Sequence, residues 1–352
     1  MIREQWYVVL ESREVGSKPM GFVRMGERLV FWRDDAGKVA CHLDKCAHRG
    51  ASLASGAVLH GEVSSDREGG RIQCPFHGIE YDASGRGRVI PANGRSAPVP
   101  DGFRLHCYPT YEARGFIWIW WGEDAPDSQP GFFEDLPETL SWSTRQDPWA
   151  NHYSRAIENQ LDMAHLPFVH YNTIGKGGKT VVDGPGIRFA DKGLFVYSRN
   201  RLDDGSLAKT PAEIALPDLA SDTGQKLEFR FPNLWQNYID EKLRIVVAFV
   251  PVDQESSILY LRFCQGFMRV AGLRALVHAV GDRMNLVIAH QDRRVVETQI
   301  PKSAGEGRGE LLFPGDAAIM EYRKMRLEAA KALGEARSAA RGAARDDGPA
   351  AR

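Results

Sequence analysis

The first part of the chain alternates short apolar runs with polar turns. Residues 21–43 read GFVRMGERLVFWRDDAGKVACHL, and a turn is expected at Asp35–Gly37. Further strands are expected at Arg71–Cys74 and Phe116–Trp121, with frequent glycine and proline between the runs. The pattern predicts an all-β domain over residues 1–125. An acidic, proline-rich linker is expected to follow over residues 126–148.

The second part of the chain contains both helix-like and strand-like patterns, and a second domain is predicted over residues 149–335. Ile157, Leu161, Ala164 and Phe168 recur at helical spacing, which predicts a helix with one apolar stripe. Strands are expected at 194–198, 226–231, 244–251 and 258–266, before a long helix from about 270 to 298. The Ala-, Arg- and Glu-rich end predicts a helix that frays into a disordered tail over residues 336–352.

The charge balance excludes some classes of protein. The net charge is −1, and the sequence has no cluster of basic residues that would bind the phosphates of a nucleic acid. The first residues, MIREQWYVVLESREV, do not have the layout of a signal peptide. The most apolar run, FIWIWW at 116–121, is too short to cross a bilayer. We therefore expect a cytoplasmic protein that binds neither nucleic acid nor membrane.

The cysteines point to metal rather than disulfides. The chain has five: Cys41, Cys46, Cys74, Cys107 and Cys264. An odd number in a chain without a secretion signal argues against a disulfide framework. Some of these thiols are therefore expected to bind metal in a reducing compartment.

Two short segments each pair one cysteine with one histidine. Residues 46–50 read CAHRG and residues 74–78 read CPFHG. Two such loops can enclose a [2Fe–2S] cluster, with Cys46 and Cys74 on one iron and His48 and His77 on the other. A structural zinc site is the alternative, but zinc sites usually place their cysteines together as a pair. A third interpretation is four unrelated residues.

A second group of polar residues lies in ENQLDMAHLPFVH, residues 158–170. Asn159, Asp162 and His165 are spaced three apart and would share one helix face. His170 would point elsewhere in a straight helix, but Pro167 interrupts the hydrogen bonds and would let the two imidazoles converge.

Two histidines and one carboxylate form the facial triad of non-heme Fe(II) oxygenases. The alternative is a pair of hydrogen-bonded, inert histidines at a helix end. Asp162 is the nearest carboxylate, and Asp282, Asp292 and Glu297 lie on the later helix. Spacing alone does not choose among them.

These motifs together resemble the Rieske-type oxygenase α subunits, in particular the vanillate demethylase and dicamba monooxygenase group. The resemblance rests on CAHRGASL, CPFHGIEYD, the 158–170 segment and QDRRVVETQ at 291–299, and it covers nearly the whole chain except the tail. It selects Asp292 as the third iron ligand beside His165 and His170. Ala47 departs from the pattern, since many members have proline there, but it touches no ligand.

The resemblance implies an α+β protein: a β Rieske domain, then a catalytic domain with a large antiparallel sheet flanked by helices, similar to a helix-grip fold. It implies one [2Fe–2S] cluster and one Fe²⁺ per subunit in a head-to-tail homotrimer. His77 and Asp162 occupy positions that pass electrons from one subunit's cluster to its neighbour's iron. Asn159, on the predicted face of Asp162, is a second catalytic candidate.

The function implied is an oxygenase component that hydroxylates, or O- or N-demethylates, a small aromatic or cyclic substrate. It would use O₂ and electrons from a separate NAD(P)H-dependent reductase, with or without a ferredoxin, since no segment resembles a nicotinamide or flavin site. Gly305–Glu310 is glycine-rich but is interpreted as a loop. The alternatives are a cis-dihydroxylating ring dioxygenase, a Rieske electron-transfer protein without mononuclear iron, and a structural zinc protein.

Substrate contacts are expected after His170. Candidates for the pocket are Phe231, Leu234, Trp235 and Asn237, whose aromatic rings suggest a flat apolar substrate. The glycine-rich loop at 173–180 carries Lys176 and Lys179 and is a candidate gate for anionic substrates.

Overall fold

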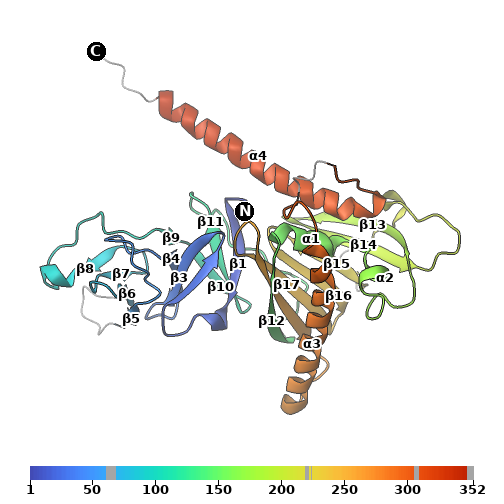
Figure 1. The fold of residues 1–352 in the computed structure, drawn as a ribbon, viewed down its shortest axis with the longest axis horizontal. Helices are drawn as coiled ribbons and strands as arrows, with labels where there is room; N and C mark the ends of the chain where they lie inside the picture. Colours follow the sequence, from blue (N-terminus) through green and yellow to red (C-terminus); the bar gives the residue numbers. More distant parts are fainter. Residues whose placement is uncertain (61–68, 219–221, 223, 305–308, 347–352) are drawn as a thin grey trace. The chain divides into compact units, whose positions relative to one another are not determined.

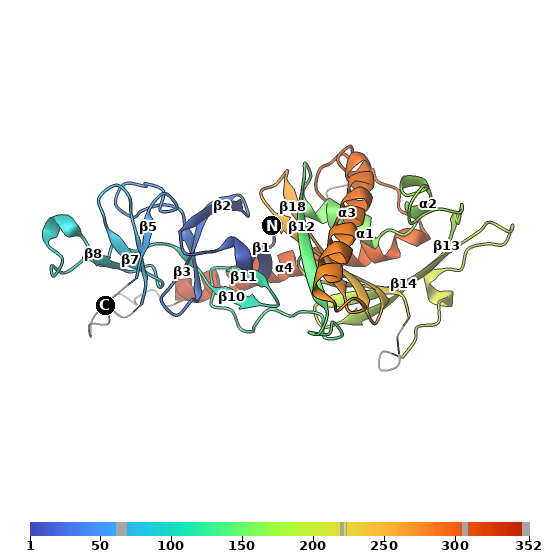
Figure 2. The same ribbon diagram turned by 90° about the horizontal axis from the view of Figure 1, so that it is seen from below.

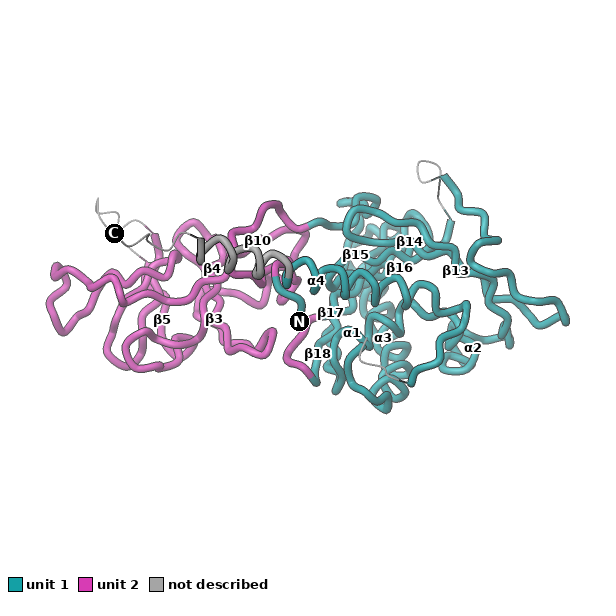
Figure 3. Tube along the Cα trace, turned by 90° about the horizontal axis from the view of Figure 1, so that it is seen from above, with its two compact units in different colours: residues 1–3, 131–249, 255–352 teal, residues 4–130, 250–254 magenta. Residues whose placement is uncertain are grey.

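The computed structural model describes all residues except 61–68, 219–221, 223, 305–308 and 347–352. The chain divides into two compact units, and Figure 3 shows each in its own colour. One unit comprises residues 4–130 and 250–254; the other comprises residues 1–3, 131–249 and 255–352. The predicted Gly305–Glu310 loop falls largely outside the described residues.

The unit built on residues 4–130 is all β in its regular elements, apart from short 3₁₀ turns. Its three sheets have the orders β1-β11-β10, β2-β3-β4-β9 and β5-β6-β7-β8. The strands are β1 (Gln5–Glu11), β2 (Met20–Arg24), β3 (Glu27–Arg33), β4 (Val39–Leu43), β5 (Ala57–Leu59), β6 (Arg71–Gln73), β7 (Glu80–Asp82), β8 (Gly87–Val89), β9 (Cys107–Tyr108), β10 (Thr110–Ala113) and β11 (Phe116–Trp121). The FIWIWW run is fully buried as β11, the central strand of its sheet.

One core cluster of this unit surrounds the cysteines of the predicted iron–sulfur motif. Trp32, Ile72 and Tyr81 are completely buried and pack together with Cys46 and Cys74. Because these strands are short, the loops that connect them start and end against this core. The core thus fixes both cysteine-bearing loops.

The second unit is built on one seven-stranded sheet of order β12-β18-β17-β16-β15-β14-β13, and each neighbouring pair with a defined register is antiparallel. Its strands are β12 (Ser141–Trp149), β13 (Val181–Ala190), β14 (Gly193–Arg201), β15 (Lys226–Arg230), β16 (Leu234–Asp240), β17 (Leu243–Pro251) and β18 (Ser257–Gln265). The order confirms the α+β fold class expected from the sequence motifs.

Helices cover one face of this sheet. They are α1 (Tyr153–Leu161), α2 (Leu166–Val169), α3 (Ala271–Val296) and α4 (Ala317–Asp346). The long helix α3 packs on β12 and β18, and α1 contacts both α3 and α4. Figures 1 and 2 show α3 running across the sheet. None of the described helices is both long and apolar enough to span a membrane.

The predicted helix with the apolar stripe is shorter than the spacing of its apolar residues indicates. Ile157 and Leu161 are buried, but α1 ends at Leu161, so Ala164 is not on it, and Phe168 is 65% exposed. The physical reason is Asp162, which adopts an extended backbone and accepts a hydrogen bond from the Ala164 N–H at 2.6 Å. Pro167 therefore does not break this helix; it lies in the first turn of α2, where proline is tolerated.

Two boundaries differ from the composition pattern. β12 begins at Ser141, inside the segment 126–148 expected as a linker. Helix α4 continues to Asp346, past residue 336 where the tail was expected to start. The first difference arises because a strand that pairs with β18 along its whole length does not need apolar residues at every position.

Candidate metal sites

The two cysteine–histidine loops share one backbone geometry. In each, the cysteine N–H donates to the carbonyl five residues later: Cys46 to Ala51 and Cys74 to Ile79, both at 2.8 Å. In each, the glycine four residues after the cysteine donates back to the cysteine carbonyl. These glycines, Gly50 and Gly78, have φ of 75° and 70°, which other residues rarely adopt.

The cysteines and the histidines of these loops differ in burial. Cys46 and Cys74 are 2% and 1% exposed, whereas His48 and His77 are exposed. The Nδ1 atoms of the two histidines lie 3.3 Å apart, so both can bind one ion. The Cys46 Sγ lies 3.2 Å from the Tyr81 hydroxyl, a hydrogen bond of the kind that tunes a cluster's potential. Burial is the main cause that raises the pKa of Cys74.

The four donors do not surround a single ion. Among the described residues, the one set of three or more metal-binding side chains with atoms within 4.8 Å of one another is His165, His170 and Asp292. A tetrahedral zinc site would bring its four ligand atoms this close. A two-iron cluster, with sulfur on one iron and nitrogen on the other, fits the arrangement better.

The second site is assembled from α1, α2 and α3. His165 caps the N-terminus of α2 and His170 follows its end, so one short turn carries both imidazoles. Asp292 lies on α3 and is 1% exposed. Its Oδ1 is 2.9 Å from the Nε2 of His170 and 3.4 Å from the Nε2 of His165.

This arrangement fits a divalent metal ion. The Asp292 Oδ1 is buried and forms no hydrogen bond of acceptable geometry with any residue that the structure describes, despite the short distance to His170. Burial lowers the pKa of His165, but Asp162 and Asp292 outweigh burial and raise it to about 9. Burial raises the pKa of Asp292, but His165 and His170 outweigh it and lower it to about 2. A bound cation would replace the imidazole proton, because a coordinating histidine must be neutral.

Outer partners orient these side chains. The Asp162 Oδ2 lies 3.3 Å from the Nδ1 of His165, and the Gln291 Oε1 lies 2.8 Å from the Nδ1 of His170. Gln160 donates to the Asp292 Oδ2 at 3.3 Å. Such contacts fix the tautomer and direction of metal ligands. Neither Gln160 nor Gln291 is among the site residues expected from the sequence. Gln160 lies within the 158–170 motif, and Gln291 is the first residue of the 291–299 motif.

The other carboxylates considered as the third ligand point elsewhere. Asp282 accepts hydrogen bonds from Ser143 at 2.6 Å and Arg145 at 3.1 Å. Glu297 accepts from the Ala150 N–H at 2.7 Å. Asn159 lines the same cavity as His165, His170 and Asp292, and its buried Nδ2 has no hydrogen-bond partner within the described ranges.

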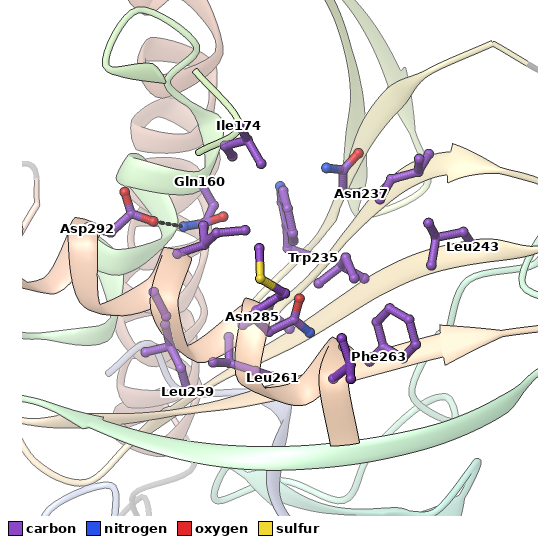
Figure 4. A pocket seen from close by; sticks show the side chains of 18 of the residues that line it. Gln160, Ile174, Trp235, Asn237, Leu243, Leu259, Leu261, Phe263, Asn285 and Asp292 are labelled. Carbon is purple, nitrogen blue, oxygen red and sulfur yellow. Dashed lines mark hydrogen bonds between the residues drawn. The ribbon is translucent and has the colours of Figure 1, made fainter. Parts of the chain in front are cut away.

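A cavity of about 380 Å³ borders His165, His170 and Asp292, and a larger one of about 640 Å³ shares part of its lining. Figure 4 shows the larger cavity between α3 and the sheet, with Asp292 at its edge. Of the four pocket candidates, Trp235 and Asn237 line it and Phe231 and Leu234 are not among its lining residues. Leu234 follows the two-residue alternation of β16 and faces the other way.

The lining is mostly aliphatic. Three aromatic rings contribute, namely Trp235, Phe263 and Phe267, among many leucine, isoleucine and valine side chains. Neither Lys176 nor Lys179 is among the described lining residues, although Ile174 of the same loop is. The expected gate for anions is therefore not supported by the cavity lining.

Comparison with known proteins agrees with this geometry. The family model for the Rieske [2Fe–2S] domain matches residues 5–109, and that for the vanillate O-demethylase oxygenase C-terminal domain matches residues 149–332. The dicamba O-demethylase oxygenase component of Stenotrophomonas maltophilia is 31% identical over 173 residues, 48% of each chain. The vanillate O-demethylase oxygenase subunit of a Pseudomonas species is 31% identical over 183 residues, 49% of this chain and 46% of that protein.

The matched segment thus spans about half the length of these relatives. The solved structure of NdmA from Pseudomonas putida CBB5 superposes with a TM-score of 0.74 at 20% identity, covering 95% of this chain and 92% of that one. At that identity the likeness concerns the fold. The second family model alone matches more than half of the chain, so the protein belongs to the vanillate O-demethylase type of Rieske oxygenases, with a Rieske [2Fe–2S] domain before its catalytic domain.

Proposed function

We propose that this protein is the oxygenase component of a multicomponent Rieske oxygenase that hydroxylates or demethylates a small organic substrate. The observation that carries the proposal is the convergence of His165, His170 and Asp292 beside a large apolar cavity. Iron at this site would activate O₂, with electrons supplied through the [2Fe–2S] cluster. The chain's own residues orient the ligands and keep water from the substrate.

The ligand roles are proposed as follows. Cys46, His48, Cys74 and His77 hold the cluster, and His165, His170 and Asp292 hold the iron. Asp162 holds the Nδ1 side of His165 and, in a head-to-tail homotrimer, links it to the neighbour's His77. A ring of heterologous interfaces is the symmetry that this link requires. A separate NAD(P)H-dependent reductase supplies the electrons.

Two measurements test this function together. Iron analysis should give about three irons per chain, two from the cluster and one from the mononuclear site. Addition of a reductase, NADH and O₂ should then give substrate-dependent NADH oxidation. About two irons per chain and no oxidation of any substrate would identify an electron carrier instead, and a colourless protein rich in zinc would contradict both.

His165→Ala should separate the two metal sites. Because the cluster ligands lie on a different unit of the chain, this variant should keep the brown colour and the Rieske absorption. Turnover should be lost, since an iron ligand is removed. Visible spectroscopy and single-turnover product analysis measure the two effects. Loss of the visible spectrum would show that the assignment of ligands to the cluster and to the mononuclear site is wrong.

The cavity lining predicts a neutral substrate. Asp292 is the one charged side chain among the described residues that line the larger cavity. Lys226 borders the smaller cavity, but its ammonium pairs with Asp222 at 3.0 Å. An anionic group placed in the cavity away from the metal would remain buried without a cationic partner, which costs several kcal/mol. The buried Nδ2 of Asn285 has no hydrogen-bond partner in the described part of the chain and suits a neutral acceptor group.

A matched pair of probes tests this substrate class. In the reaction with a reductase, NADH and O₂, 4-methoxyacetophenone should show a KM at least about tenfold lower than that of 4-methoxybenzoate, because the carboxylate would have to be desolvated without a cationic side chain beside it. Asn285→Leu should raise the KM of the ketone only. An equal or lower KM for the benzoate would contradict the prediction.

A further inference from the structure

The catalytic sheet carries a second cavity on the face turned away from the metal site. On β17, Leu243, Ile245 and Val247 line the apolar cavity, so Arg244 between them faces the opposite side. A separate cavity of about 400 Å³ lies there, and Arg244 and Tyr238 both line it. Its volume is within the range of small-molecule sites.

Arg244 is the unusual residue of this cavity. Its side chain is among the largest fully buried ones, at 2% exposure, yet its Nε has no hydrogen-bond partner among the described residues. Its one side-chain hydrogen bond to a described residue runs from Nη1 to the Leu243 carbonyl at 3.4 Å. No described carboxylate forms an ion pair with it. Arginine keeps its charge in proteins, so burial leaves an unneutralised cation.

Tyr238 fixes the direction of this guanidinium. The guanidinium carbon of Arg244 lies 3.3 Å from the Tyr238 ring centroid, and the Lys226 ammonium lies 4.4 Å from the same centroid. The Tyr238 ring therefore stacks on the Arg244 guanidinium and restricts its orientation. A cation held in one orientation binds an anion at a smaller entropic cost.

Further cations line the same cavity. Lys242 and Arg269 both contribute to its wall and form no ion pair with a described residue. Lys226 is neutralised by Asp222 at 3.0 Å. Three cations therefore remain for a ligand, with Arg244 buried and the other two beside it.

Two of the three acidic residues of the described wall accept hydrogen bonds, and one of them, Asp222, is paired with a cation. Asp222 accepts from Lys226 and from the Tyr197 hydroxyl at 2.8 Å, and Asp135 accepts from Gln236 at 2.6 Å. Glu241 is the remaining carboxylate of the described lining. With Lys226 and Asp222 paired, Arg244, Lys242 and Arg269 face the carboxylates of Asp135 and Glu241, so the positive charge of the described lining still exceeds the negative by one.

We propose that this cavity is a second ligand site, which binds a small oxyanion, a carboxylate or a phosphate, through Arg244. Both groups match the planar fork of a guanidinium, which can donate two parallel hydrogen bonds to them. Among the described lining residues, it shares only Lys226 with the cavity beside the metal site, and it has no role in the proposed oxygenation. Its ligand would neutralise the buried charge and stabilise the folded protein.

Binding is tested with two probes on the holoprotein. Inorganic phosphate and benzoate are titrated by calorimetry into wild type, Arg244→Met and Arg274→Met. Wild type and Arg274→Met should bind, since Arg274 is exposed on α3 outside this cavity. Arg244→Met should bind about 10- to 100-fold more weakly, the usual effect of a lost charged hydrogen bond. Phosphate binding alone identifies a phosphate site, and benzoate binding alone a carboxylate site.

Thermal unfolding gives a second, independent measurement. The melting temperature of wild type should rise with the concentration of the bound probe, since only the folded state has the site. Arg244→Met should fold, because removing an unpaired buried charge is not costly, and its melting temperature should not respond. The proposal is overturned if wild type binds neither probe, or if Arg244→Met binds and is stabilised as wild type is.

Discussion

Asp292→Ala should release the mononuclear iron and leave the cluster in place. The carboxylate lies 2.9 Å from His170 and 3.4 Å from His165, so its loss removes the single anionic donor of the set. Iron should fall from about three to about two per chain, with the Rieske absorption unchanged. Turnover should fall by more than about 100-fold, since even the loss of an outer partner costs 10- to 100-fold.

Glu297→Gln is the matched control for this change. Glu297 is on the same end of the same helix but accepts from the Ala150 N–H, and glutamine retains an acceptor there. Iron content and turnover should both stay at the wild-type level. If Glu297→Gln loses iron while Asp292→Ala retains it, the third ligand has been assigned wrongly.

The cysteine–histidine loops could be read from the sequence because their geometry is local. Each loop needs a cysteine, a histidine and a glycine with positive φ within five positions, and the residue types report all three requirements. Burial of Cys46 and Cys74 then follows from the short strands around them. A local motif of this kind can be recognised in the sequence without knowing how distant segments pack.

The helix before His165 could not be read correctly because periodicity does not show where a helix ends. Ile157 and Leu161 are buried as their spacing predicts, and Phe168 satisfies the same spacing but is 65% exposed. The decisive interaction is one hydrogen bond from the Ala164 N–H to Asp162. Aspartate side chains compete with helical hydrogen bonds in this way, and the spacing of apolar residues does not reveal such competition.

The proposed third ligand and the cavity depend on contacts between distant segments. Asp282 and Asp292 lie on the same helix, and both are nearly fully buried. Only the path of α3 across the sheet places one beside Arg145 and the other beside His170. The resemblance of residues 291–299 to a known motif selected Asp292, where spacing alone left the choice open. The Arg244 cavity carried no sequence signal, because its cations and acids come from separate strands and loops.

Asp162→Asn should stop electron transfer to the iron without removing either metal. The Asp162 Oδ2 lies 3.3 Å from the Nδ1 of His165, and Oδ1 accepts the Ala164 N–H that ends α1. Asparagine keeps the size and the Oδ1 acceptor, so the turn and the position of His165 should persist. It loses the negative charge and the second acceptor, on which the proposed link to the neighbour's His77 depends.

The measurement is single turnover of prereduced protein with O₂ and substrate. The variant should hold about three irons per chain, as wild type does, and its cluster should still be reduced by the reductase. Cluster reoxidation and product yield should both nearly cease. Ferricyanide should reoxidise the cluster normally, because that reaction bypasses the iron, and it serves as the control. Normal product yield in Asp162→Asn would mean that electrons reach the iron by a route that does not involve this carboxylate.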